Sequence, residues 1–293
     1  MHVDEVDTDP LLVQRLVAGR FPEWADLPIE PVLPLGTDNA NYRLGSDKLV
    51  RLPRQPDKVT GLEREFEWLP VFARTLTLAI PAPLGRGEPA EGYPFPWGVF
   101  TWLDGENVEV GDVAPEAAED LAELITALRG LDTTNHPPGL RHGTLRERDD
   151  WVRSCADQMD ARYDAEGLLA AWEKTLEAPP WDGPPTWCHC DLDLRNIIFR
   201  NGRPSGVLDW GGAGAGDPAS DAAAGWKLLP AGARPGFWDA LGADEAEITR
   251  ARGWTLMQCA GALWYYTPEN NPALYFEAER WLTELLGSAP TPA

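Results

Sequence analysis

Two carboxylates and one amide, Asp191, Asn196 and Asp209, flank an Asn201-Gly202 pair. An Asn-Gly pair between two strand-like runs favours a β-hairpin with a two-residue turn. Such a turn places residue 196 opposite 207 and residue 194 opposite 209. Asn196 and Asp209 then become diagonal neighbours on one face of the hairpin. We therefore expect an amide oxygen and a carboxylate to converge on one point.

An amide oxygen beside a carboxylate is a pair of hard-oxygen ligands, and Mg2+ prefers such ligands. Asp191 stands in the turn before the first predicted strand. It can point to the same place without binding the ion. The alternative interpretation is a loop-capping aspartate followed by the ordinary polar residues of a hairpin. The agreement of three spacings with the turn favours a shared functional site over this alternative.

The elements before this segment change character near residues 102–106. Runs 41–44 and 49–52 flank Gly45-Ser46-Asp47 and predict a hairpin, and run 97–103 predicts a further strand. Between them, apolar residues at 62, 66, 69 and 72 predict one helix. The sequence therefore predicts a β-rich first part.

The rest of the chain has mainly helical spacing. Helices are predicted over 115–131, 151–159 and 167–176, and Asn271-Pro272 supplies an N-cap followed by proline for a late helix. The fold class predicted is α+β. It consists of a β-rich domain at 1–103 and a larger, mainly helical domain at 104–293, which carries the polar constellation.

Composition and charge narrow the function classes. The chain has 293 residues, 43% of them hydrophobic, with 25 basic against 47 acidic residues and a net charge of −22. So acidic a surface repels phosphate backbones, which excludes a nucleic-acid binder. It attracts cationic small molecules, although solubility alone explains the charge equally simply. No stretch is long and apolar enough for a membrane span. The N-terminal residues lack a signal-peptide pattern, so we expect a cytoplasmic protein.

In combination, these motifs resemble the aminoglycoside phosphotransferase family of small-molecule kinases, which has the protein-kinase-like fold. The resemblance covers most of the chain. It rests on the segments His189-x-Asp191-x4-Asn196, Asp209-Trp210-Gly211, Gly216-Asp217-Pro218-Ala219-Ser220-Asp221, Val50-Arg51-Leu52-Pro53-Arg54, Glu65-x-x-Trp68-Leu69-Pro70, Trp102-Leu103-Asp104-Gly105-Glu106, Tyr265-Tyr266 and Asn271-Pro272.

The resemblance implies a two-lobed fold, with a small antiparallel sheet and one helix before a helical lobe. It implies that Asp191 orients the attacking hydroxyl and accepts its proton. Asn196 and Asp209 would hold Mg2+ on the nucleotide phosphates. Arg51 would grip the phosphates from a strand, with Glu65 on the next helix as its ion-pair partner. Arg51 departs from the usual lysine of the superfamily.

The resemblance further implies where ATP or GTP would bind. A phosphate-covering loop would run through Gly36–Asn41 and use the side chains of Thr37 and Asn39. The base would bond to the backbone of a hinge formed by Phe100, Thr101, Trp102 and Leu103.

Other polar residues of the segment invite structural interpretations. His189 is expected to hold the loop rather than act as a base, and Asp217 and Asp221 to cap and brace the helix that follows. Asp193 faces either substrate or solvent. Cys188-His189-Cys190 lacks the Cys-x2-Cys spacing of structural zinc, so the cysteines are expected to be reduced and buried. A zinc protein remains an alternative.

The acceptor is expected to be a small, cationic hydroxyl compound such as an aminoglycoside-type antibiotic, because carboxylates bind ammonium groups. The acidic candidates for binding it are Asp149, Asp150, Asp157, Asp160, Glu269 and Glu277. The alternatives are a kinase for a macrolide, for choline, for homoserine or for an amino sugar, and a non-catalytic nucleotide-binding relative. The sequence indicates no oligomeric state.

Overall fold

The computed structural model describes residues 5–33 and 38–287, and it divides the chain into two compact units. Unit 1 consists of residues 1–106 and 205–212, and unit 2 of residues 107–204 and 213–293. The predicted division into domains at 103/104 stays a prediction. The compact units differ from it in that unit 1 also includes residues 205–212. None of the helices in the described part of the chain could cross a membrane.

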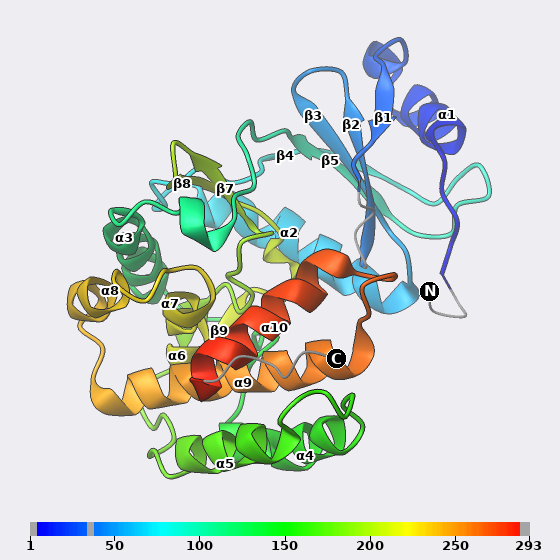
Figure 1. Ribbon diagram of the computed structural model, residues 1–293. Coiled ribbons are helices and arrows are strands. Elements are labelled where there is room, and N and C mark those ends of the chain that lie inside the picture. The colour runs from blue at the N-terminus through cyan, green and yellow to red at the C-terminus, as the bar shows by residue number, and fades with distance from the viewer. Residues whose placement is uncertain (1–4, 34–37, 288–293) are drawn as a thin grey trace. The chain divides into compact units, whose positions relative to one another are not determined.

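Unit 1 is built on an antiparallel sheet of five strands in the order β1-β2-β3-β5-β4 (Figure 1). Its elements are α1 (Pro10–Arg20), β1 (Ile29–Pro31), β2 (Asn39–Leu44), β3 (Lys48–Pro53), α2 (Val59–Phe72), β4 (Pro83–Gly87) and β5 (Trp97–Thr101), with the short 3-10 helices η1 (Pro22–Trp24), η2 (Pro56–Lys58) and η5 (Trp210–Gly212). The predicted hairpin is confirmed, with Gly45 in the left-handed region at φ 63°. The predicted helix begins three residues earlier, at Val59, and ends at Phe72 as expected.

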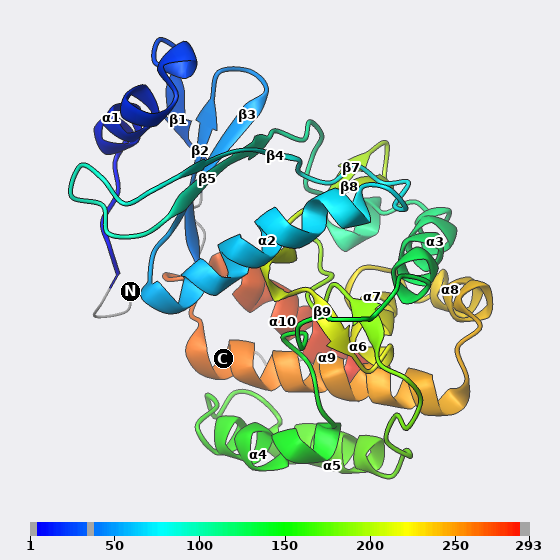
Figure 2. The ribbon, with the colours of Figure 1, turned by 180° about the vertical axis from the view of Figure 1, so that it is seen from behind.

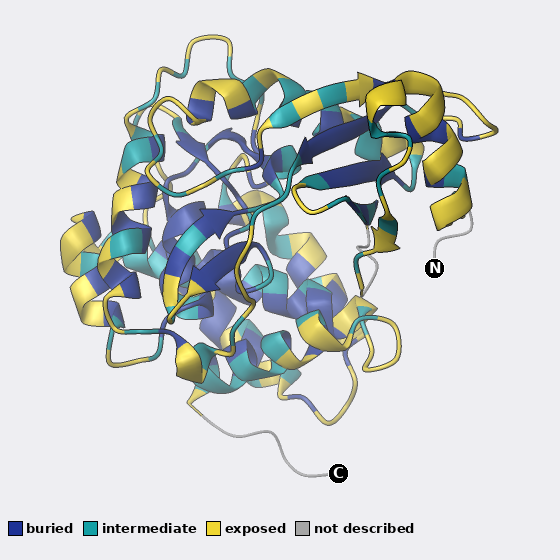
Figure 3. Ribbon diagram, turned by 90° about the horizontal axis from the view of Figure 1, so that it is seen from above, coloured by how far each residue is buried: buried dark blue, intermediate teal, exposed yellow. Residues whose placement is uncertain are grey.

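The core of unit 1 lies between the sheet and α1. Alternate residues of β2 are buried, which is the pattern of a strand with one face in the core, whereas β3 and β5 are buried along almost their whole length (Figure 3). Val13 and Leu16 of α1 pack in one cluster with Tyr42 and Trp97. The sheet is therefore a rigid support for the side chains of β3.

Unit 2 is mainly helical. Its elements are η3 (Val110–Asp112), α3 (Ala117–Arg129), η4 (Leu145–Arg148), α4 (Asp149–Asp157), α5 (Ala165–Leu176), β6 (Thr186–Cys188), β7 (Ile197–Arg200), β9 (Gly214–Gly216), α6 (Ala219–Ala222), α7 (Ala224–Lys227), α8 (Arg234–Leu241), α9 (Glu245–Tyr265) and α10 (Pro272–Leu286). The long helix α9 packs against α10, α6, α5 and α4, and α3 lies beside α8 (Figure 2). The Asn271 side chain accepts a hydrogen bond from the backbone N–H of Leu274, which confirms the predicted cap of α10. The α+β class is therefore confirmed.

The predicted Asn-Gly hairpin is also confirmed. β7 pairs with β8 (Arg203–Val207) in a two-stranded sheet, and Asn201 and Gly202 have φ values of 53° and 73°. Both values belong to the turn that joins two-residue hairpins. A side chain at Gly202 would also lie 2.6 Å from the carbonyl oxygen of Asp112. Glycine is therefore required here by both conformation and space.

Candidate active site

The loop between β6 and β7 is held by a buried carboxylate. Asp221 accepts hydrogen bonds from the backbone N–H groups of His189 and Cys190, each across 2.7 Å. Cys190 has φ 70°, a left-handed conformation that costs a non-glycine residue about 1–2 kcal/mol. The Nδ1 atom of His189 accepts a hydrogen bond from the backbone N–H of Asp191. These contacts confirm the bracing predicted for Asp221 and the structural role predicted for His189.

Three side chains donate hydrogen bonds to the carboxylate of Asp191. Arg141 Nη2 and Gln258 Nε2 lie 2.9 and 3.0 Å from its Oδ1 atom. Asn196 Nδ2 lies 3.1 Å from its Oδ2 atom. A carboxylate oxygen can accept about two hydrogen bonds. Oδ1 is therefore saturated by protein donors, and Oδ2 keeps room for one further donor.

The charge of Asp191 follows from its surroundings. Burial alone would raise the pKa of this carboxyl group, but attraction to Arg141, Lys227 and Arg195 outweighs burial and holds the pKa well below its ordinary value. The group is consequently ionised at neutral pH. It is a strong hydrogen-bond acceptor and a weak base.

Asn196, a residue of unit 2, is buried, with 8% of its surface exposed. Its amide nitrogen is used twice, because it donates to both the backbone oxygen and the Oδ2 atom of Asp191. The amide oxygen is thereby turned away from Asp191 and can serve as a ligand. Asp193, on the same loop, is fully buried and forms an ion pair with Arg195 across 2.5 Å. Of the two alternatives for Asp193, substrate or solvent, the structure excludes solvent, because the carboxylate is buried beside Arg195.

Unit 1 brings together the other predicted polar residues. Arg51 on β3 and Glu65 on α2 form a buried ion pair, which confirms the predicted partnership. Glu65 also accepts a hydrogen bond from the backbone N–H of Trp210 across 3.0 Å. Burial raises the pKa of Glu65 despite the charge of Arg51, and the charge of Asp209 adds to that rise. Asp209 has φ 58° and precedes η5 directly.

The predicted site residues thus fall into two sets. Arg51, Glu65 and Asp209 belong to unit 1, and Asp191 and Asn196 to unit 2. Each set is assembled within its own unit by the contacts described above. The convergence of Asn196 and Asp209 on one metal ion stays a prediction.

The residues predicted to bind the nucleotide lie in unit 1, except that Thr37 is outside the described residues. Asn39 begins β2, and its Oδ1 atom is buried without a hydrogen-bond partner among the described residues. In the predicted hinge, the N–H of Thr101 donates to Ala82 and the N–H of Trp102 donates to Asp47. These two donors are therefore already occupied. Phe100 is buried in β5, and its ring lies 5.2 Å from that of Phe66.

Sequence reasoning missed Arg141 and Gln258. Arg141 comes from the loop before η4, and Gln258 from the middle of α9. Neither residue belongs to a sequence motif that contains Asp191. Their positions beside Asp191 therefore depend on the packing of unit 2. Lys227, also missed, is fully buried, and its Nζ atom has no hydrogen-bond partner among the described residues.

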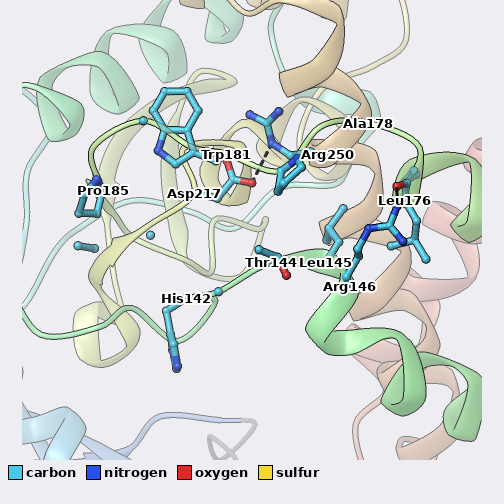
Figure 4. A pocket seen from close by; sticks show the side chains of 16 residues that line it. His142, Thr144, Leu145, Arg146, Leu176, Ala178, Trp181, Pro185, Asp217 and Arg250 are labelled. Atoms are coloured by element: carbon cyan, nitrogen blue, oxygen red, sulfur yellow. Dashed lines mark hydrogen bonds and ion pairs between the residues drawn. The ribbon is translucent and has the colours of Figure 1, made fainter.

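A separate cavity of about 260 Å³ opens in unit 2 beside Asp217 (Figure 4). Arg250 on α9 donates to the Asp217 carboxylate across 2.9 Å, and the ring of Trp181 lies against the same guanidinium. Asp217 also accepts a hydrogen bond from the backbone N–H of Ala219, at the start of α6. The sequence predicts Asp217 as the N-cap of this helix, but the structure places Pro218 there, and Asp217 contacts the first turn of α6 from the preceding position. None of the predicted catalytic or metal-binding residues lines this cavity.

The Cys188-His189-Cys190 segment does not form a metal site with its neighbours. Within residues 5–33 and 38–287, no three histidine, cysteine or acidic side chains are grouped so that they could hold an ion. Burial raises the pKa of the Cys190 thiol to about 11 and that of Cys188 well above its ordinary value. Both side chains are therefore protonated thiols at neutral pH.

Comparison with known proteins gives a consistent result. The model of a phosphotransferase enzyme family matches residues 31–285. The uncharacterised protein YcbJ of Bacillus subtilis (strain 168) is 26% identical over 194 residues, which are 60% of this chain and 61% of that protein. The chain thus matches about three fifths of the length of this curated relative.

Solved structures share the fold. The GDP and kanamycin complex of APH(2″)-IIIa has a TM-score of 0.75 at 18% identity, covering 94% of this chain and 99% of that one. The streptomycin–ATP complex of APH(2″)-IIa has a TM-score of 0.63 at 17% identity, covering 90% and 94%. The apoenzyme of macrolide 2′-phosphotransferase MphH from Brachybacterium faecium has a TM-score of 0.61 at 20% identity, covering 94% and 97%.

Proposed function

Because the chain belongs to the phosphotransferase enzyme family, we propose that it transfers the terminal phosphoryl group of ATP or GTP to a hydroxyl group of a small molecule, with Asp191 as the catalytic residue. The observation that carries the proposal is the state of the Asp191 carboxylate. It is ionised, held by donors from three elements, and has acceptor capacity left only on Oδ2.

Asp191 would act mainly by orienting the acceptor. The hydroxyl group donates its hydrogen to Oδ2, which fixes the direction of the oxygen lone pair that attacks phosphorus. Because the pKa of Asp191 is held low, proton transfer to it is unfavourable until the hydroxyl oxygen has begun to bond to phosphorus. This order of events fits the loose transition state of phosphoryl transfer, in which positioning supplies most of the catalysis.

The oxygen ligands present fit a magnesium ion. Asn196 has an amide oxygen left over from its bonds to Asp191, and Asp209 adds a carboxylate. We propose that these two side chains hold Mg2+, since hard oxygen ligands suit this ion. When bound, the ion would neutralise charge on the nucleotide phosphates.

Arg51 would bind the nucleotide phosphates. Glu65 neutralises and orients its guanidinium group, whose Nε atom is buried without a partner among the described residues. Asn39 and Thr37 would add polar contacts to the phosphates. In the hinge at Phe100–Leu103, the N–H groups of Thr101 and Trp102 are occupied, so the base would bond to other backbone groups of this segment. The proposal places this activity in the cytoplasm.

The acceptor proposed is a small cationic molecule of the aminoglycoside type, so that the activity would inactivate an antibiotic. The acidic surface of the chain supports a cationic ligand. Glu277 on α10 has an Oε2 atom buried without a partner within the described chain, and burial raises its pKa to about 7. Asp149, by contrast, is engaged with Trp172 and Arg153, which weakens its candidacy.

A macrolide or another hydroxyl-bearing metabolite is the second candidate for the acceptor. Unit 2 carries half-exposed aromatic side chains that would suit an apolar ligand, namely Trp151, Trp264, Tyr265 and Phe276. A third possibility is a relative that binds nucleotide without catalysis.

Mass spectrometry of the acceptors distinguishes these functions. The purified protein is incubated with Mg2+, ATP and GTP, and a panel of kanamycin, gentamicin, streptomycin, a macrolide, choline, homoserine and amino sugars. The wild type should add one phosphoryl group to a member of the panel, and Asp191→Ala should add none while binding nucleotide equally well. EDTA should abolish the transfer, and excess Mg2+ should restore it. Nucleotide binding without transfer by the wild type would favour the binding-only function, and absence of nucleotide binding would refute the proposal.

A further inference from the structure

Gln258 has an amide whose two ends are in very different situations. Its Nε2 atom lies 3.0 Å from Oδ1 of Asp191. An ionised carboxylate can only accept hydrogen bonds, so the nitrogen end of the amide must face Asp191. The oxygen end is thereby fixed on the other side. There, Oε1 is buried and has no hydrogen-bond partner among the described residues.

A buried amide oxygen without a partner is costly, since its desolvation is not repaid by a hydrogen bond. Buried polar atoms in native proteins nearly always have a partner, and an exception calls for an explanation. The atom lies on the same side chain that holds the catalytic carboxylate. A hydrogen-bond donor on the bound acceptor molecule would supply the missing partner at the moment when Asp191 is used.

We propose that Gln258 is a specificity-determining residue for the acceptor and a positioning residue for Asp191. Oε1 accepts a hydrogen from a hydroxyl or ammonium group that neighbours the reacting hydroxyl, while Nε2 holds Oδ1 of Asp191. The acceptor class is consequently an amino alcohol or diol with two neighbouring donor groups, as found in amino sugars. This inference rests on the proposed function of Asp191.

The two ends of the amide cooperate in this arrangement. The amide plane is rigid, so a donor bound at Oε1 fixes the direction of the N–H bond on the opposite side. Arg141 donates to the same oxygen of Asp191 and keeps the carboxylate in place from a different element. An acceptor without the second donor group would leave Oε1 unpaired and would align Asp191 less well.

Two substitutions distinguish the role of the amide nitrogen of Gln258 from that of its amide oxygen. Gln258→Glu keeps an oxygen for the acceptor but replaces the N–H that holds Asp191 with a second carboxylate oxygen. Gln258→Leu has a similar size and removes both ends. Gln158→Leu is the matched control, because the exposed side chain of Gln158, at the C-cap of α4, hydrogen-bonds to Ser154 alone among the described residues.

Steady-state kinetics are measured with the panel member that the wild type phosphorylates, and with its analogue in which hydrogen replaces the donor group next to the phosphorylated hydroxyl. Gln258→Leu should raise KM about tenfold, the value of one neutral hydrogen bond, and should lower kcat as well. Gln258→Glu should lower kcat about tenfold or more with KM near the wild-type value. The wild type should prefer the full acceptor over the analogue about tenfold, and Gln258→Leu should lose this preference.

Nucleotide affinity should match that of the wild type in all three variants. The melting temperature should stay near the wild-type value in Gln258→Leu and Gln158→Leu, which distinguishes positioning from a merely structural role. It should fall in Gln258→Glu, because a second carboxylate then faces Asp191. Equal kinetics in wild type and Gln258→Leu, or an unchanged preference over the analogue, would overturn the inference and leave the proposed function intact. That result would mean that water fills the place beside Oε1. Absence of transfer by the wild type to every panel member would refute the proposed function, and the role of Gln258 would fall with it.

Discussion

The Asp221 carboxylate accepts a hydrogen bond from the backbone N–H of Cys190, 2.7 Å away. The contact holds a non-glycine residue in the left-handed region directly before Asp191. The shape of the loop that carries Asp191 therefore depends on a side chain that lies on α6.

Substitution of Asp221 by alanine should destabilise the protein and disorganise this loop. Two buried N–H groups would lose their hydrogen-bond acceptor, at a cost of about 3 kcal/mol in the free energy of unfolding. Urea unfolding measures this cost, and kcat should fall with it. Asp239→Ala on the surface of α8 is the control and should change both quantities little. Unchanged stability of Asp221→Ala would show that the brace is not needed.

Substitutions at Cys190 would test whether the left-handed backbone conformation at this position is strained. Glycine adopts positive φ without penalty, whereas alanine keeps the strained backbone and also loses the thiol. Cys190→Gly should therefore be more stable than Cys190→Ala by roughly 1 kcal/mol. Both variants lack the sulfur that packs against Gly139, so the comparison isolates the backbone. Equal midpoints of urea unfolding would count against strain at this position.

The Arg51–Glu65 pair is buried and should behave differently from a surface ion pair. Arg51→Met leaves the Glu65 carboxylate without its counter-charge, and this should lower the free energy of unfolding by about 3–5 kcal/mol. The double variant with Glu65→Gln should recover much of that loss, because glutamine still accepts the N–H of Trp210. The exposed pair Arg15–Glu91 provides the control.

Arg15→Met should cost less than about 1 kcal/mol, as is usual for exposed pairs. A double variant at 51 and 65 as unstable as Arg51→Met alone would mean that packing, and not charge, makes the site sensitive. Both variants at position 51 should also weaken nucleotide binding, which equilibrium titration measures separately from unfolding.

Lys227 should make stability depend on pH. Burial lowers the pKa of its ammonium group from 10.5 to about 8, and the charge of Arg141 adds to this effect. Between these two values the unfolded chain binds more protons than the folded chain, so stability rises with pH. Lys227→Met should therefore stabilise the protein at pH 7, by up to about 3 kcal/mol.

The advantage of Lys227→Met should shrink as the pH approaches 10. Urea unfolding at pH 7 and pH 9.5 measures this, with Lys174→Met on the exposed face of α5 as the control. A stability difference that is independent of pH would show that the gain comes from packing.

Local sequence signals predicted those parts of the site whose residues are close in the chain. Asn201-Gly202 fixed the hairpin because only particular residues adopt its backbone angles. Asp221 could be assigned as a brace because the motif that contains it, Gly216-Asp217-Pro218-Ala219-Ser220-Asp221, comes soon after the loop in the sequence. The pairing of Arg51 with Glu65 was expected from the family resemblance, and the strand and helix that carry them are clear in the periodicity.

The donors to Asp191 could not be predicted in this way. Arg141 and Gln258 reach the carboxylate from separate elements, so their approach depends on how α9 packs within unit 2. The burial of Asp193 could not be predicted from the sequence for a related reason. Its burial depends on Arg195 folding back beside it, and the charge of a side chain alone predicts exposure.

The four cysteine thiols are free and buried, so their reaction with an alkylating reagent would report local unfolding of this chain. Burial raises the pKa of Cys155 and Cys190 to about 11, so almost no thiolate is present for alkylation in the folded state. Cys155 lies in α4, Cys190 in the loop that carries Asp191, and Cys259 on α9 against α10. Reagents such as iodoacetamide would consequently label each region only when it loosens. Mass spectrometry of the cysteine-containing peptides would show the urea concentration at which each thiol becomes labelled. The order of labelling would rank the helices and the loop by local stability, without any engineered probe.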